Sequence, residues 1–181
     1  MCSPSVCGGF STAFGISDLS LIRGDGKMAT RPCHCGYLGH YSGRCHCTPG
    51  QVARYRSRIS GPLLDRIDLR IEVPALTEGE LLRAGKGESS HVVRTRVAGA
   101  REIQLRRQGI ANAQLSVRAL EEYAPVDDEG KRLLRDATCT LNLSARAHHR
   151  VIRVSRTIAD LEECATIRSE HIAETLLYRG N

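Results

Sequence analysis

The stretch SARAHHRVIRVSRTIADL, residues 144–161, decides the fold that this sequence predicts. Ser144 favours the N-cap position, so a helix is expected to begin just after it. The apolar residues of the stretch fall at positions i, i+3, i+7 and i+10, which places them in one stripe along a helix. They are Val151, Val154, Ile158 and Leu161. The sequence therefore predicts a long helix with this stripe facing a core.

Shorter helices are predicted on either side of the long one, each starting at a residue that favours the N-cap. These starts are Ser116, for a helix to Tyr123, Asp127 and Ser169. The residues expected to face inward are Leu133, Leu134, Ala137 and Leu141 after Asp127, and Ile172, Leu176 and Leu177 after Ser169. Residues 111–181 are therefore expected to form a packet of four helices.

A further helix is predicted before this packet. Ser89 or Ser90 can cap it and Gly109 can end it. Its apolar positions are Val93, Val97, Ala100 and Ile103, and its opposite face carries Arg94, Arg101 and Arg106.

Further upstream, the pattern changes from helix to strand. Thr48 followed by Pro49 predicts a helix start, with the helix running to about Ile59 and stopped by Gly61 and Pro62. Residues 67–73 alternate apolar and charged side chains, which is typical of a β-strand with one buried face. The expected fold class is mainly α, with one strand and a cysteine loop at the end of an α/β core, followed by a helical bundle.

Four of the eight cysteines lie within residues 33–47, as two Cys-x-Cys pairs separated by nine residues. Glycines between the pairs allow the loop to reverse direction with little steric strain, so four thiolates can surround a zinc ion. The predicted ligands are Cys33, Cys35, Cys45 and Cys47, with His34, His40 and His46 as possible substitutes. Four protein ligands leave no open position, which favours a structural over a catalytic metal. Two disulfides or unliganded thiols are the alternatives.

Charge and hydropathy narrow the class of protein. The 181 residues have a net charge of +6, and 23 of the 26 basic residues are arginine. Residues 48–118 hold 13 basic and seven acidic residues, which favours a phosphate or nucleic-acid partner there, with solvated helix faces as the alternative. The sequence has neither an apolar run long enough to cross a bilayer nor a secretory signal pattern, so a cytoplasmic location is expected.

Two arginines are candidates for contacts with phosphate. Arg66 follows a Gly-Pro turn and precedes the predicted strand, where it can reach a phosphate on a neighbouring subunit. The alternative is a local pair with Asp65 or Asp68. Arg146 lies in the first turn of the long helix, where the helix dipole opposes a cation unless an anion is near.

Several motifs, taken in order, closely resemble the C-terminal half of the ComM (YifB) family of magnesium-chelatase-like AAA+ ATPases. The motifs are PCHCGY at 32–37, CHCTP at 45–49, RYRSRISGPLLDRIDL at 54–69, GESS at 87–90, RQG at 107–109, NAQL at 112–115, LSAR at 143–146 and RTIADL at 156–161. The resemblance covers about residues 29–178.

The resemblance implies a ring-forming motor, expected to be a hexamer, that uses ATP and Mg²⁺ on DNA and is linked to branch migration in natural transformation. By position, Arg66 matches the arginine finger that acts in trans, and Arg146 matches the sensor-two arginine of a helical lid. The four cysteines match the cysteine cluster of the family. Arg31 stands where the family has the sensor-one asparagine, a change that would alter how an attacking water is oriented.

The resemblance also divides the chain. It implies the end of an AAA+ core with the zinc loop and finger at 29–75, a connecting helical segment at 76–110 and the lid at 111–181, with 1–28 unassigned. The one candidate phosphate loop, at 24–27, lacks the required first Gly, because Leu21 is there, and Met28 stands where Ser or Thr is needed. The chain is therefore expected to be a truncated copy without ATPase activity of its own. The alternatives are a standalone zinc-stabilised DNA-binding module and a fragment of a magnesium chelatase ATPase subunit.

Overall fold

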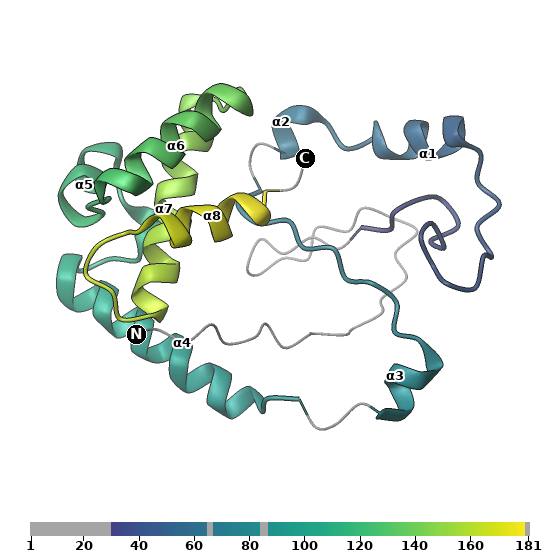
Figure 1. The fold of residues 1–181 in the computed structure, drawn as a ribbon, viewed down its shortest axis with the longest axis horizontal. Coiled ribbons are helices and arrows are strands. Elements are labelled where there is room, and N and C mark those ends of the chain that lie inside the picture. The colour runs from purple at the N-terminus through teal and green to yellow at the C-terminus, as the bar shows by residue number, and fades with distance from the viewer. Residues whose placement is uncertain (1–29, 65–66, 84–86, 180–181) are drawn as a thin grey trace. The chain divides into compact units, whose positions relative to one another are not determined.

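A computed structural model describes residues 30–64, 67–83 and 87–179 of the chain (Figure 1). The chain divides into two compact units. Among the described residues, the helical unit comprises 67–71 and 88–179, and the cysteine unit comprises 30–64, 72–83 and 87. Among the described residues, none of the helices combines the length and the apolar composition that spanning a lipid bilayer requires.

The helical unit contains five α-helices and a short 3₁₀ helix among its described residues. They are α4 (Ser90–Gln108), η1 (Asn112–Gln114), α5 (Val117–Tyr123), α6 (Asp128–Thr140), α7 (Ala145–Leu161) and α8 (Ser169–Leu177). The central element is α7, which packs against α4, η1, α5 and α8, while α6 packs against α8. Figure 1 shows α8 crossing α7.

Local capping explains where these helices begin. The side chains of Ser89, Ser116, Asp127 and Ser144 each accept a hydrogen bond from a backbone N–H of the first turn, as their sequence positions predicted. Gly109 ends α4 with φ of 74°, a left-handed conformation that glycine adopts without steric cost. At α8 the prediction was one residue late, because Arg168 occupies the N-cap position and Ser169 is the first helical residue.

The core of the helical unit lies where α5, α6, α7 and α8 meet. Its buried members are Leu115, Leu120, Ala124, Leu134, Val151, Ala159, Ile167 and Ile172. An isolated parallel bridge between Val126 and Ile167 joins the segments that lead into α6 and α8.

The predicted stripe of α7 is buried only in part. Val151 is 1% exposed and Ile158 is also buried, but Leu161 is 38% exposed. At about 100° per residue, Ala159 lies roughly 80° from Val151 on one side and Leu161 lies roughly 80° away on the other. The buried face follows the Ala159 side, so the prediction for Leu161 was wrong.

Two other residues predicted to face the core are exposed. Leu141 is the C-cap of α6 and is 44% exposed, and Leu177, the last residue of α8, is 80% exposed. Both lie at helix ends, where the chain leaves the core. The apolar interior of these two helices is made by Leu134, Ala137 and Ile172.

The compact helical unit extends upstream of residue 111, the predicted start of the lid. Its main segment begins at Glu88 and includes α4. The reason is long-range packing of α4 on α7, which periodicity within α4 cannot reveal.

The cysteine unit contains three short helices among its described residues: α1 (Pro49–Arg56), α2 (Gly61–Leu64) and α3 (Glu78–Arg83). Thr48 caps α1 in a capping box with Gln51. The helix ends at Arg56, three residues before the predicted end. The predicted stop at Gly61 and Pro62 instead opens α2, because proline is tolerated in the first turn of a helix.

The predicted strand at 67–73 was wrong. These residues are irregular, with a bend at Asp68, and form no strand ladder with any other described residue. Leu69, Ile71 and Val73 are 45%, 69% and 66% exposed. Alternation supplies an apolar face, but a strand also needs a partner for its backbone groups. Part of the segment is instead held to the helical unit, where Arg70 N donates to Tyr178 O over 2.6 Å and Arg150 pairs with Asp68.

Candidate functional site

The loop between the two cysteine pairs folds back through three consecutive turns. Gly36 N, His40 N and Gly43 N each donate a hydrogen bond to the carbonyl oxygen three residues earlier. Gly36 and Gly43 have φ of 82° and 63°, which L side chains rarely adopt. These turns bring Cys33 and Cys35 back to Cys45 and Cys47.

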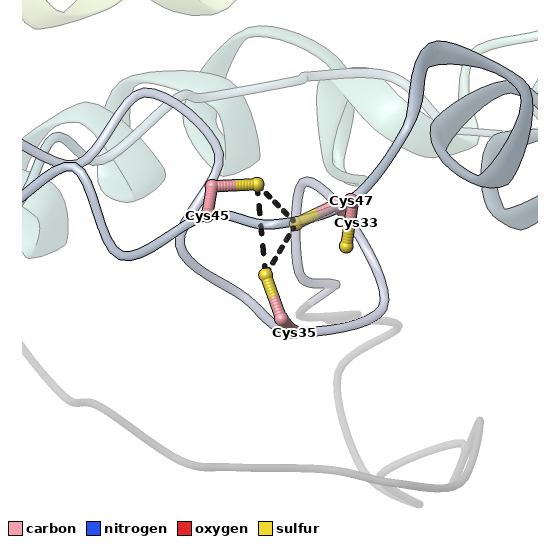
Figure 2. Close-up of side chains that lie close together, drawn as sticks. All are labelled: Cys33, Cys35, Cys45 and Cys47. Atoms are coloured by element: carbon pink, nitrogen blue, oxygen red, sulfur yellow. Dashed lines mark hydrogen bonds between the residues drawn. The ribbon is translucent and has the colours of Figure 1, made fainter.

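Figure 2 shows the result, with the four cysteine side chains gathered in one place. The Cys33 sulfur lies 3.4 Å from that of Cys35 and 3.8 Å from that of Cys45, and the Cys35 and Cys45 sulfurs are 3.6 Å apart. All four sulfurs, Cys47 included, lie within 4.8 Å of one another. Zn–S bonds of about 2.3 Å in a tetrahedron place sulfurs about 3.8 Å apart. The four cysteines are therefore spaced to hold a tetrahedral metal ion, and all four are free thiols.

Cys35, Cys45 and Cys47 differ in the direction in which their surroundings shift the pKa of the thiol. A hydrogen bond from the Tyr37 backbone lowers the pKa of Cys35 to about 6 against the opposing effect of desolvation. The Cys47 backbone acts to lower the pKa of Cys45, but desolvation and the neighbouring thiols Cys35 and Cys33 raise it to about 11. The Cys35 backbone likewise lowers the pKa of Cys47, and side-chain hydrogen bonding with Cys35 together with desolvation raises it overall. Thiolates this close together repel one another, so a cation among them favours their ionised forms.

The three histidines of the loop do not join this group of ligand atoms among the described residues. His34 makes an edge contact with the Tyr55 ring at 6.4 Å, and His40 stacks on Tyr41 at 4.4 Å. His40 Nδ1 also accepts a hydrogen bond from Ser42 N. The predicted substitution of a cysteine by histidine is therefore not what the geometry favours.

A second group of possible ligand atoms consists of Glu162, Cys164 and His171. The ring of its histidine already takes part in hydrogen bonds. His171 Nδ1 accepts one from Arg168 N at the start of α8. That leaves Nε2 to donate to Glu162 over 3.1 Å. Neither ring nitrogen offers a lone pair for a metal, so this group stabilises the start of the helix.

The two candidate arginines are placed differently. Arg66 lies outside the described residues. Arg146 is exposed in the first turn of α7, and no ion pair with another described residue involves it. A guanidinium at the positive end of a helix, without a local carboxylate, is suited to meet an anion.

Arg31 packs against the cysteine loop. A Cβ built on Gly36 would meet the Arg31 side chain at 3.3 Å. The half-buried Arg31 therefore covers the first turn of the loop, a contact that the sequence did not reveal.

A pocket that the sequence did not predict lies beside Cys47. It has a volume of about 210 Å³ and is lined by His34, Cys47, Gln51, Arg54, Tyr55 and Arg58. The last four fall at positions i, i+3, i+4 and i+7, which is the spacing of one helix face. That spacing is a signal that could have singled them out.

A buried polar network in the helical unit was likewise not predicted from the sequence. The Asp160 carboxylate accepts hydrogen bonds from Arg107 over 2.6 and 3.0 Å, from Arg156 over 2.8 and 3.1 Å and from Asn112 over 2.7 Å. Arg156 also donates to the backbone carbonyls of Cys164 and Ala165. The network ties α4, η1 and α7 to the segment before α8. Its only local signal is the i, i+4 spacing of Arg156 and Asp160.

Comparison with known families gives two matches in chain order. The family model described as "Magnesium chelatase, subunit ChlI" matches residues 26–81, and that described as "Magnesium chelatase, subunit ChlI C-terminal" matches residues 87–179. The second match has nearly the same limits as the main segment of the helical unit.

Individual relatives agree with these matches. The chain is 47% identical over 144 residues to competence protein ComM of Haemophilus influenzae and 45% identical over 144 residues to protein YifB of Salmonella typhimurium. Each alignment covers 78% of this chain. It is also 34% identical over 156 residues, 84% of its length, to protein Mb2921c of Mycobacterium bovis. The chain spans only 28% to 30% of the length of these relatives.

Proposed function

Because the chain belongs to the magnesium chelatase ChlI family and is similar to part of ComM and YifB, we propose that it supplies a zinc-stabilised loop and a helical lid to an AAA+ ATPase ring that acts on DNA. One observation carries the proposal: two features occur together in this chain. The C-terminal family model matches the compact helical unit, and a cluster of four cysteines lies upstream of it in the sequence. A magnesium chelatase subunit is the alternative within the family. The similarity to ComM and YifB favours the DNA motor.

The cluster of Cys33, Cys35, Cys45 and Cys47 is proposed to bind one structural zinc ion. Four sulfur donors at tetrahedral spacing suit Zn²⁺. The loop needs such an ion, since only Cys33 is buried among residues 30–64 whose burial is described, and α1 buries no residue. Metal binding would then supply the folding energy that packing does not.

The two arginines are proposed to act on nucleotide held by other subunits or other parts of a complete ring. Arg146, exposed at the start of α7, would contact phosphate from the lid, and Arg66 would reach the nucleotide of a neighbour. Both residues only stabilise charge on phosphates, and the 181 residues contain no phosphate-loop pattern. ATP and Mg²⁺ are therefore proposed only for the complete oligomer, and no ATP turnover is expected from this chain alone.

Two exposed apolar residues of the helical unit support assembly with another polypeptide. Leu69 and Ile71 are 45% and 69% exposed. Neighbouring exposed apolar side chains mark interaction sites in soluble proteins. We assign these two residues to contacts within the ring and place the assembly in the cytoplasm.

Mixed assembly tests the proposal. Full-length ComM of Haemophilus influenzae would be titrated with this chain while ATP turnover is measured. The parent chain should change the turnover of the full-length subunits, and Arg66→Ala should lower that turnover while leaving ATP binding nearly intact, because a finger acts mainly in the transition state.

Arg94→Ala is the matched control, since it removes an exposed arginine of α4 to which no contact with nucleotide or nucleic acid is assigned. An Arg66→Ala chain that supports the same turnover as the parent would remove the finger assignment. A parent chain that neither binds the full-length subunits nor alters their turnover would overturn the ring proposal.

A further inference from the structure

The segment from residue 30 to residue 64 has an unusual charge composition. It contains five arginines, Arg31, Arg44, Arg54, Arg56 and Arg58, and no Asp or Glu. Among the described residues, no carboxylate lies within ion-pair distance of Arg54 or Arg58, and both are exposed. A surface of one sign attracts a partner of the opposite sign.

Two of these arginines line the pocket described above. Arg54 and Arg58 lie four residues apart and share it with Gln51, Tyr55 and His34. Arg54 lies in the last turn of α1, where the helix dipole favours a cation without any ligand. Arg58 lies beyond the end of α1 and lines the same pocket. The helix dipole alone therefore does not explain why both arginines lie at this pocket.

Aromatic rings accompany the charge. The half-buried Tyr55 is packed edge-on to His34 in the pocket wall. Farther along the loop, Tyr37 and Tyr41 flank His40, with Tyr41 57% exposed and stacked on the imidazole. Rings interleaved with arginines provide stacking platforms for bases beside cations for phosphates.

We propose that the pocket beside the cysteine cluster binds single-stranded nucleic acid. Arg54 and Arg58 contact successive phosphates, and an unstacked base lies against Tyr55 and His34. A duplex keeps its bases stacked and cannot offer a base face to the pocket. This inference rests on the proposed zinc ion to order the loop, and it deepens the proposed function by assigning where the strand is held.

The test uses the full 181-residue chain, purified with its zinc, and a fluorescein-labelled oligothymidine followed by anisotropy at several salt concentrations. Each phosphate contact to a single strand contributes about −0.7 to the slope of log K against log salt. The double variant Arg54→Ala/Arg58→Ala should therefore make the slope shallower by about 1.4 and weaken binding by about ten-fold or more.

Arg94→Ala/Arg101→Ala is the matched control, because it removes two exposed arginines of α4 in the helical unit. It should leave the slope and affinity close to those of the parent. Tyr55→Ala should weaken binding about five-fold or more while Tyr55→Phe retains it, since stacking needs the ring and not the hydroxyl. Zinc content and circular dichroism of every variant show whether the fold is kept.

Equal losses in the two double variants would show a diffuse charge effect and overturn the site. A duplex that binds as tightly as the single strand would overturn the base contact, and ATP that competes as well as the oligonucleotide would indicate a nucleotide pocket instead. A chain that holds zinc but leaves the oligothymidine free would overturn this inference alone. The mixed-assembly experiment tests the proposed lid function separately.

Discussion

At the scale of the residue, Asp160 organises the interior of the helical unit. Its carboxylate has no exposed surface and is surrounded by Arg107, Arg156 and Asn112. Desolvation acts to raise the pKa of Asp160, but hydrogen bonds from Arg107 and Asn112 and the charge of Arg156 lower it overall. The folded state therefore holds this group as a carboxylate.

Replacing Asp160 with Asn should destabilise the chain by about 3 to 5 kcal/mol, because it leaves the buried Arg156 guanidinium without its counter-charge. Urea unfolding measures the change. Asp136→Asn, at an exposed position of α6, is the matched control and should change the free energy of unfolding by less than about 0.5 kcal/mol. Equal effects of the two substitutions would contradict the role assigned to the network.

The same carboxylate makes stability depend on pH. Since the pKa of Asp160 is lower in the folded state than its usual value of about 3.9, its contribution is fully present above about pH 4. It should be lost as the pH falls through the folded-state pKa. Unfolding measured across this range should show a steeper acid loss for the parent than for Asp160→Asn, and identical profiles would argue against a depressed pKa.

The cysteine cluster yields a second prediction at this scale. The chain purified without chelator should contain one zinc ion, and Cys45→Ser should lose it, because three thiolates leave the tetrahedron open. Cys139→Ser is the matched control, since Cys139 is an exposed free thiol of α6. Elemental analysis decides the matter. A content below about 0.2 zinc per chain, a small fraction of one tetrahedral site, would rule out the proposed site.

At the scale of the element, α7 shows how a helix face is selected. Its caps and periodicity are properties of residues 144–161, but the direction of its buried face depends on where α4, α5 and α8 lie. Val151 is enclosed by this packing, and Leu161, in the same helix, is not.

These two residues form a matched test. Val151→Asp should abolish the cooperative unfolding transition, because a charge without a partner would be buried in the core. Leu161→Asp should leave the melting temperature close to that of the parent, as Leu161 is exposed. Thermal circular dichroism distinguishes them, and a folded Val151→Asp variant would show that α7 buries a different face.

At the scale of the whole molecule, the two units are stabilised by different means. The helical unit has an apolar core and the Asp160 network. In the cysteine unit, Cys33 is the one buried apolar residue among those described. Its stability is therefore expected to depend on the metal.

Removal of zinc should affect one unit alone. A strong chelator should make residues 30–64 sensitive to protease while the helical unit keeps its circular dichroism and its melting temperature within about 2 °C. Limited proteolysis with mass spectrometry locates the cuts. Loss of both units together would show that they unfold as one.

Features that depend on neighbours along the chain could be predicted from the residues alone. Thr48, Ser89, Ser116, Asp127 and Ser144 cap helices as predicted, because a cap is a hydrogen bond between residues two or three apart. The cysteine pairs converge as predicted, because glycine turns between them are also local.

Features that join distant segments were decided by tertiary structure. Asp160 and Arg107 are 53 residues apart, and no local pattern connects them. The strand expected at 67–73 has alternation but no pairing partner among the described residues, and Leu161 has helical periodicity but points away from the packed side. Periodicity determines which residues share a face, whereas burial of that face requires other elements to pack against it, and their positions follow only from the whole fold.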